Sequence, residues 1–175
     1  MYLHLYIESS EDFPYETVGD AAVAGWESKH EGDSFALHEV PAQSALRSRV
    51  ANGGPGRPVA LTLIRRSPQV QLDLETISED HDLVVYIADN VSDMLPQTMT
   101  DVVEHANSLG IPIILVALSA GLRRGDARNL GFESAYEIFP ERAFLTEEQR
   151  TPVPVDEMAQ RISKEFARIA TTWAW

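Results

Sequence analysis

Two runs of aliphatic residues constrain the fold of this chain more than any other feature of its sequence. They are Leu83–Ile87 and Ile113–Ala117, and continuous β-branched and aliphatic runs are typical of strands covered on both faces in a parallel sheet. Between the two runs, apolar residues recur at helical spacing, at Leu95, Met99, Val102, Val103, Ala106 and Leu109. Ser92 or Asp93 can cap the start of this helix, and Gly110 can end it. The pattern predicts a βαβ unit, whose right-handed crossover places both strands in one sheet.

The remaining elements follow from the same periodicities. Further strands are predicted at residues 3–7, 34–40, 59–64 and 134–139, and helices at 17–29, 44–50, 123–130 and after Pro154. The glycines and prolines of residues 52–58 predict a loop, and residues 65–81 match neither pattern. We therefore predict one α/β domain over residues 1–175: a doubly wound, mainly parallel sheet of about five or six strands with helices on both faces.

Charge and composition exclude several classes of function. The chain has 27 acidic and 14 basic residues and a net charge of −13, which repels phosphate backbones and anionic lipids. We expect neither a nucleic-acid partner nor a membrane partner. The chain has no cysteine, which excludes disulfides, thiolate catalysis and cysteine-ligated zinc. The first residues lack the basic start of a signal peptide, and we expect a cytoplasmic location.

The search for catalytic motifs finds no phosphate-binding P-loop and no Gly-x-Ser-x-Gly nucleophile elbow. The five histidines are scattered, and no two have the spacing that puts two metal ligands on one helix face, so a histidine metal site is disfavoured. His4 and His38 are expected on one side of the sheet. An exposed Trp175 would be a contact for a second subunit, and a homodimer is therefore one expected assembly.

One dense polar cluster follows the strand at Leu83–Ile87. It contains Asp89, Asn90, Ser92 and Asp93, and open parallel sheets bind ligands at the carboxyl ends of their strands. A functional interpretation makes Asp89 or Asp93 a magnesium ligand or a general base, with Asp89 the first candidate for the metal. The alternative interpretation makes Ser92 and Asp93 helix caps and the other two turn residues, and short polar residues favour it.

With these residues in view, the chain resembles the type I glycerate kinases. The matching segments are Asp82–Val85, Gln97-Thr98, Gly110–Ile114 and Gly131–Pro140, with weaker matches at Glu8-Ser9 and Gly54–Val59. Members of that family have a Rossmann-like domain that is interrupted by a second domain, with the active site between the two. The resemblance implies that the second domain is deleted here between residues 64 and 81. It also implies ligand-binding positions at Ser9, Arg57, Asn90, Ser92, Gln97 and Thr98, with magnesium at Asp89 and Asp93 if a kinase site survives.

The departures from the family's pattern concern its loops. Glu11 and Asp12 stand where the family has a lysine, Ala42–Ser48 replaces a glycine-rich loop, and Ala88–Thr98 lacks the family's glycines and arginine. Phosphoryl transfer depends on positioned cations and backbone donors. The resemblance with these departures implies a degenerate glycerate-kinase-like domain without kinase activity or cofactor, which binds a small organic acid or serves in assembly.

Two alternatives stay open. One is an active kinase of glycerate or a related hydroxy acid that uses Mg-ATP. The other is a different small-molecule enzyme that uses the same crevice.

Overall fold

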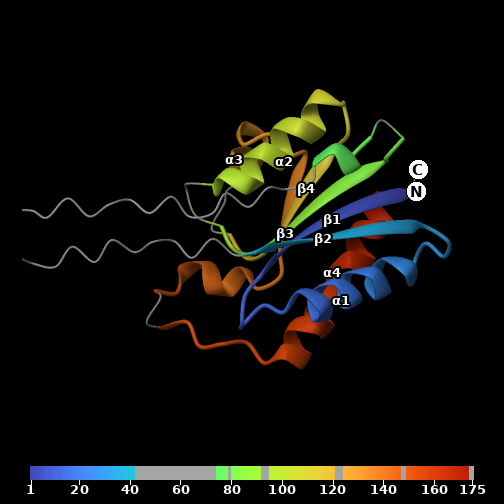
Figure 1. Ribbon diagram of the computed structural model, residues 1–175. Coiled ribbons are helices and arrows are strands. Elements are labelled where there is room, and N and C mark those ends of the chain that lie inside the picture. Colours follow the sequence, from blue (N-terminus) through green and yellow to red (C-terminus); the bar gives the residue numbers. More distant parts are fainter. Residues whose placement is uncertain (42–73, 79, 92–94, 121–123, 147–148, 174–175) are drawn as a thin grey trace, which may run out of the picture.

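The fold is built on one parallel β-sheet (Figure 1). The computed structural model of the chain describes residues 1–41, 74–78, 80–91, 95–120, 124–146 and 149–173. The strands are β1 Tyr2–Ser9, β2 Ser34–Pro41, β3 Leu83–Asn90, β4 Ile113–Ser119 and β5 Ser134–Glu137. The helices are α1 Tyr15–Glu27, α2 Gln97–Ser108, α3 Arg124–Asn129 and α4 Val155–Thr172, with the short 3-10 helices η1 Leu74–Thr76 and η2 Pro140–Phe144.

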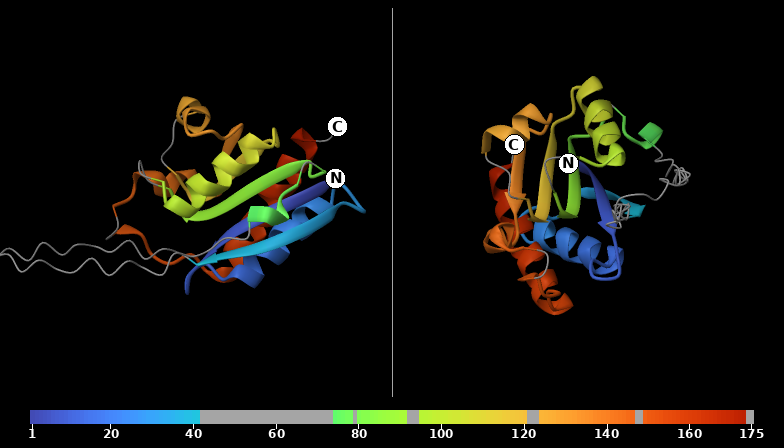
Figure 2. Two further views of the ribbon diagram at one scale, coloured as in Figure 1. Left: turned by 45° about the horizontal axis from the view of Figure 1, so that its top comes forward. Right: turned by 90° about the vertical axis from the view of Figure 1, so that its left-hand side faces the viewer.

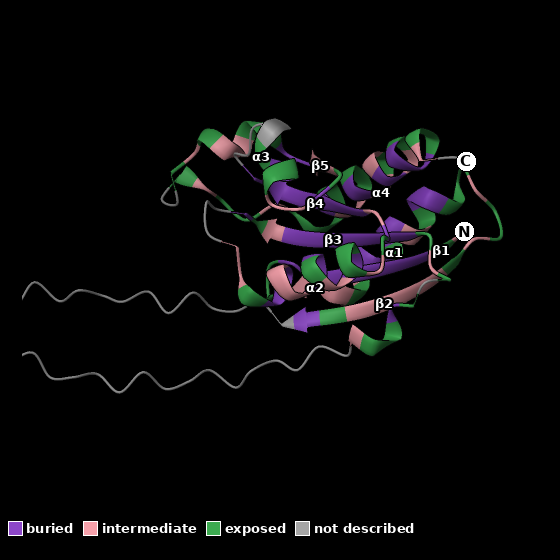
Figure 3. Cartoon of the chain, turned by 90° about the horizontal axis from the view of Figure 1, so that it is seen from above, coloured by how far each residue is buried: buried purple, intermediate pink, exposed green. Residues whose placement is uncertain are grey.

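The strand order is β2-β1-β3-β4-β5, and each neighbouring pair is parallel. This is the flavodoxin-like order of a doubly wound sheet. It confirms the predicted doubly wound α/β architecture of about five or six mainly parallel strands with helices on both faces: the described residues form five strands, and all neighbouring pairs are parallel. β3 and β4 are buried along nearly their whole length (Figure 3), as their uninterrupted aliphatic sequences predict.

The helices form two layers. α1 and α4 cover one face of the sheet, and α2 and α3 cover the other (Figures 1 and 2). On the first face, α1 and α4 also pack on each other, because Gly25 has no side chain: a Cβ atom there would lie 2.2 Å from the backbone oxygen of Ser163. The alternation of side chains along β1 divides its residues between the layers, so that Leu5 joins the α1–α4 core and Tyr6 the α2–α3 core.

The boundaries of α2 correct one prediction. The helix begins at Gln97 with Pro96 as its N-cap residue, and no side chain caps it. The prediction that Ser92 or Asp93 caps this helix is therefore wrong; proline suits this position because its fixed φ is compatible with a helix start. Gly110 follows α2 with a φ of 72°, so the predicted glycine stop is confirmed, and Gly131 follows α3 in the same way with a φ of 91°.

Several predicted elements lie outside the described residues: the helix at 44–50, the loop at 52–58 and the strand at 59–64. Of the unassigned residues 65–81, the structure describes only 74–78, which include η1, and 80–81, which precede β3. Trp173 donates a hydrogen bond of 3.1 Å to the Tyr136 hydroxyl group, whereas Trp175 lies outside the described residues. Among the helices that the structure describes, none is long and apolar enough to span a membrane.

Candidate functional site

Polar side chains gather where β1 and β3 end. β1 continues toward α1 on one face of the sheet and β3 toward α2 on the other, so the chain leaves these neighbouring strands in opposite directions. Ligands of doubly wound sheets bind at such a switch point. We call the residues gathered here the carboxyl-end site; they are Glu8, Tyr86, Asp89, Asn90, Thr98, Arg142 and Arg150.

A chain of hydrogen bonds runs from α2 to the end of β1. The Tyr86 hydroxyl group donates to Glu8 Oε1 at 3.1 Å, and it accepts a hydrogen bond from the buried Thr98 hydroxyl group. Tyr86 pairs with Tyr6 in the sheet register and reaches diagonally to Glu8, two residues further along the same face of β1. The Glu8 carboxylate is thus held in place by residues that are themselves buried.

The environment of Glu8 changes its proton affinity. Burial raises the pKa of Glu8 from 4.5 to about 7, and the negative charge of Asp89 adds to the rise. Hydrogen bonds from the Tyr86 hydroxyl group and from the Asp89 backbone N–H act in the opposite direction. A carboxyl group with a pKa near neutral pH can both accept and donate a proton under physiological conditions.

Asp89 lies at the same edge of the sheet, near charges of both signs. Burial and the negative charge of Asp12 raise the pKa of Asp89, and the Arg142 guanidinium group lowers it. Asn90 donates a hydrogen bond to the Asp89 carboxylate. Three acidic side chains, those of Glu8, Asp89 and Asp12, and the two basic side chains of Arg142 and Arg150 therefore act at this edge.

Arg142 lies in η2, and Arg150 lies in the segment between η2 and α4. Arg142 Nη2 donates to the backbone oxygen of Thr151 at 2.8 Å, and Arg150 Nη1 donates to Asn90 Oδ1 at 3.0 Å. Arg150 Nε is buried and has no hydrogen-bond partner among the residues that the structure describes. A buried donor without a partner costs about 1–3 kcal/mol, which a ligand acceptor would recover.

The structure brings together three of the residues that the sequence singled out: Asp89, Asn90 and Thr98. It separates two others from them. Ser9 donates to Glu39 Oε1 at 2.6 Å toward β2, and Gln97 donates to Asp101 Oδ1 at 2.7 Å on the exposed side of α2. Arg57, Ser92 and Asp93 lie outside the described residues. In the described part of the chain, no group of three histidine, aspartate or glutamate side chains could hold a metal ion, so Asp89 has no described companions for one.

Sequence reasoning missed Glu8, Tyr86, Arg142 and Arg150 as members of this site. Tyr86 is the single residue with a polar tip in an aliphatic run, and Glu8 is a charged residue on the same face as Tyr6, so both left a weak signal. The arginines left none, because neither the short 3-10 helix η2 nor the segment after it has a periodic pattern in the sequence.

The histidines were correctly placed in one respect. His4 and His38 lie on the same side of the sheet, as predicted, with His4 Nδ1 2.8 Å from His38 Nε2. His81, which the sequence did not connect with them, lies with its Nε2 atom 3.4 Å from His4 Nε2.

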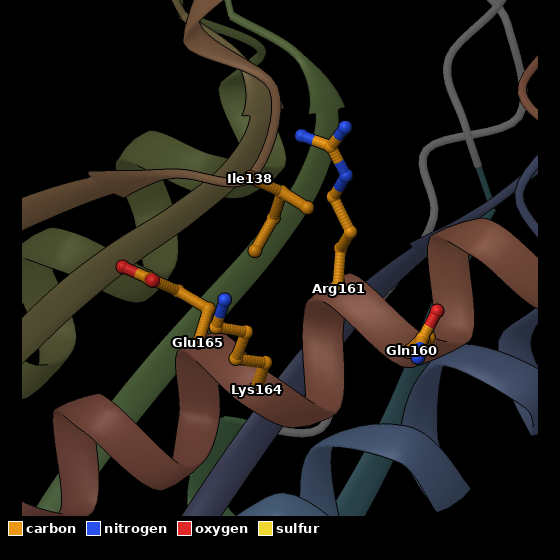
Figure 4. Close-up of a pocket in the computed structure, with 5 residues that line it drawn as sticks. All are labelled: Ile138, Gln160, Arg161, Lys164 and Glu165. Carbon is orange, nitrogen blue, oxygen red and sulfur yellow. The ribbon is translucent and has the colours of Figure 1, made fainter.

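Two surface pockets lie elsewhere. One of about 480 Å³ lies between α4 and the residue after β5 and is lined by Ile138, Gln160, Arg161, Lys164 and Glu165 (Figure 4). Ile138 belongs to the α1–α4 core, whereas Tyr86 belongs to the core on the other face. A second pocket of about 470 Å³ is formed around Ile113 and Phe132, near the amino ends of β4 and β5. Neither pocket includes a residue of the carboxyl-end site.

Comparison with known proteins finds no matching family model and no match among curated proteins. Among solved structures, the chain is similar to a flavodoxin from the domain Archaea, with 10% identity and a TM-score of 0.42 over 98% of this chain and 99% of that one. It is similar to an azoreductase from Bacillus anthracis, with 12% identity and a TM-score of 0.43 over 99% and 100% of the two chains. It is also similar to a flavone reductase, with 12% identity and a TM-score of 0.41 over 98% of this chain and 63% of that one.

The resemblance to type I glycerate kinases is wrong. No model of that or any other family matches the chain, and the similar solved structures are a flavodoxin and reductases. The main segments that carried the resemblance have plain structural roles: Asp82–Val85 contains the start of β3, Gly110–Ile114 is a helix stop followed by β4, and Gly131–Pro140 is a helix stop followed by β5. Any parallel α/β sheet needs such segments. The predicted degenerate kinase, its deleted second domain and the active-kinase alternative that uses Mg-ATP are withdrawn with the resemblance.

Proposed function

We propose that this chain is a small-molecule enzyme in which the Glu8 carboxyl group transfers a proton to or from an anionic organic substrate bound in the carboxyl-end site. The observation that carries the proposal is the hydrogen-bonded chain from Thr98 through Tyr86 to Glu8 at the switch point of the sheet. General acid–base catalysis requires a carboxyl group that is fixed in position and has a proton affinity matched to the working pH.

The substrate class follows from the charges around Glu8. The chain as a whole repels anions, but Arg142 and Arg150 bring two positive charges to this site, where both act to lower the pKa of Asp89, and Arg150 Nε has no described partner. A guanidinium group binds a carboxylate through paired N–H donors. A small organic acid therefore suits this site better than a phosphate ester, because Glu11 and Asp12 in the turn before α1 and Glu16 in its first turn repel a dianion.

Deuterium exchange tests the proposed chemistry without knowledge of the complete reaction. The protein is incubated in D₂O with a panel of hydroxy and keto monocarboxylic acids, and loss of C–H signals is followed by proton NMR. We expect deuterium exchange with at least one acid. In Glu8→Gln the exchange rate should fall about 100-fold or more, and Arg150→Gln should bind the acid more weakly. Arg128→Gln, an exposed arginine near the amino end of β5, is the matched control and should behave like the wild type. Exchange that is equal in Glu8→Gln and the wild type would contradict the proposal.

Flavin binding is a second candidate, which the strand order favours. In flavodoxins, which share this order, FMN lies at the switch point between β1 and β3. Because the start of α1 is acidic, we expect riboflavin to bind at least as tightly as FMN, with quenching of flavin fluorescence as the measurement. No quenching at micromolar protein would remove this candidate and leave the acid–base proposal in place. A cytoplasmic place of action belongs to the same proposal and is tested by fractionation of cells that express the tagged chain.

A further inference from the structure

A second group of titratable side chains lies away from the carboxyl-end site. His4 is central in this group: its Nδ1 atom lies 2.8 Å from His38 Nε2 on β2, and its Nε2 atom lies 3.4 Å from His81 Nε2, just before β3. Both ring nitrogens of His4 therefore contact other imidazoles, and His4 is only 1% exposed. We call these three residues the histidine chain.

One backbone group sets the direction of the histidine chain. The Ser78 backbone N–H donates to His81 Nδ1 at 2.8 Å, so this nitrogen accepts and carries no proton. A neutral imidazole has one N–H, which for His81 must then be Nε2–H, directed at His4 Nε2. His4 Nε2 accepts in turn, and its own proton lies on Nδ1, from which it donates to His38 Nε2. Every tautomer is thus assigned by the Ser78 contact.

We infer that His81, His4 and His38 form an acid-sensing site: a directed chain of neutral imidazoles that begins at the Ser78 backbone N–H, in which protonation of an outer imidazole breaks the hydrogen bond at that end and protonation of His81 releases the Ser78 N–H. A second proton on His81 would place an Nδ1–H opposite the Ser78 N–H. A second proton on His38 would place an Nε2–H opposite the His4 Nδ1–H. Either change turns a hydrogen bond into a contact between two donors. Imidazole is the side chain that ordinarily changes charge between pH 5 and 8.

The surroundings favour the neutral form of the central residue. The rings that face His4 are those of His38 from β2, His81 from the turn, and Tyr2 and Tyr6 from β1. Burial, with the imidazoles of His81 and His38, lowers the pKa of His4 to about 4. His4 therefore cannot absorb the proton that an outer histidine receives.

The same geometry argues against a metal ion. The 3.4 Å between His4 Nε2 and His81 Nε2 would suit two ligands of one zinc ion, but zinc would need a lone pair on His81 Nε2. The Ser78 N–H already occupies Nδ1 and leaves the proton on Nε2. Zinc binding is therefore an outcome that would overturn the assigned chain.

Long-range ¹H–¹⁵N NMR of the imidazoles in the full chain tests the inference. At pH 7.5 we expect protonated Nε2 in His81 and protonated Nδ1 in His4 and His38. His105→Gln serves as the control for assignment, because it removes an imidazole of α2 outside the histidine chain. An Nε2–H tautomer of His4 at pH 7.5, or Zn²⁺ binding at micromolar concentration that His4→Gln abolishes, would overturn the inference.

Amide hydrogen exchange tests whether acid releases the Ser78 N–H from His81. We expect the protection factor of the Ser78 amide, corrected for intrinsic exchange, to fall at least about tenfold between pH 7.5 and pH 5 while that of Val85 in β3 is unchanged. His81→Ala should give the low protection at both pH values. Equal protection of Ser78 at pH 7.5 and pH 5 in the wild type would overturn the release.

Discussion

The Tyr86 hydroxyl group reaches diagonally across two parallel strands and donates a 3.1 Å hydrogen bond to the Glu8 carboxylate. Tyr86 lies opposite Tyr6 in the register of β1 and β3, and Glu8 lies two residues after Tyr6 on β1. Because Thr98 donates to Tyr86 in turn, α2 and the two central strands position one carboxyl group together.

Tyr86→Phe should raise the pKa of Glu8 above its value of about 7. The hydrogen bond from Tyr86 favours the ionised carboxylate, so its removal favours the neutral acid. We expect a rise of up to about one pH unit, which corresponds to about 1.4 kcal/mol. ¹³C NMR of glutamate side-chain carboxyl groups over a pH titration measures it. A fall in the pKa would show that the hydroxyl group does not donate to Glu8.

Glu8→Gln should change how stability depends on pH. Glu8 has a raised pKa in the folded chain, so the folded state is favoured while the group is protonated, and this contribution is lost as the pH rises from 4.5 through about 7. The full change corresponds to at most about 3 kcal/mol, and since Glu8 is half-buried we expect roughly half of that. Urea denaturation at several pH values should show Glu8→Gln gaining stability relative to the wild type between pH 4.5 and pH 8. A constant difference would contradict the raised pKa.

His4→Gln should change the pH dependence of stability in the opposite direction to Glu8→Gln. The pKa of His4 is lowered from 6.5 to about 4 in the folded chain, so the unfolded chain binds the proton more readily. The contribution of His4 is complete above pH 6.5 and is lost as the pH falls toward 4, by at most about 3 kcal/mol. Relative to His4→Gln, the wild type should therefore lose stability on acidification. If the urea-unfolding midpoints of the wild type and His4→Gln differed by the same amount at every pH from 7 to 4.5, the burial of a neutral His4 would be ruled out.

Gly25→Ala should loosen the contact between α1 and α4. The new Cβ atom would lie 2.2 Å from the Ser163 backbone oxygen and 2.9 Å from Phe166 Cβ, and neither atom can move without shifting α4. We expect a loss of about 3 kcal/mol in the free energy of unfolding, measured by urea denaturation. Asp20→Ala on the exposed side of α1 is the control and should stay within about 0.5 kcal/mol of the wild type. A Gly25→Ala variant as stable as its control would mean that the helices separate at little cost.

The sequence identified part of the candidate site. Asp89 and Asn90 were recognised because a polar pair directly after a buried strand is a local pattern. Glu8 and Tyr86 are 78 residues apart, and nothing local connects them. The mistaken family resemblance has a related cause, since strand starts and glycine helix stops recur wherever helices alternate with buried parallel strands.

The sequence by itself determined the type and approximate position of most of the elements that the structure describes. Burial on one side or on both sides of an element leaves a periodic pattern along the chain, and the aliphatic runs of β3 and β4 and the stripe of α4 are such patterns. Only the tertiary structure decided which strands are neighbours. Because β1 lies between β2 and β3, the same strand brings Glu8 to Tyr86 at one end and His4 to His38 and His81 at the other. The clusters that can do chemistry here are contacts between strands, and such contacts leave no periodic pattern in the sequence.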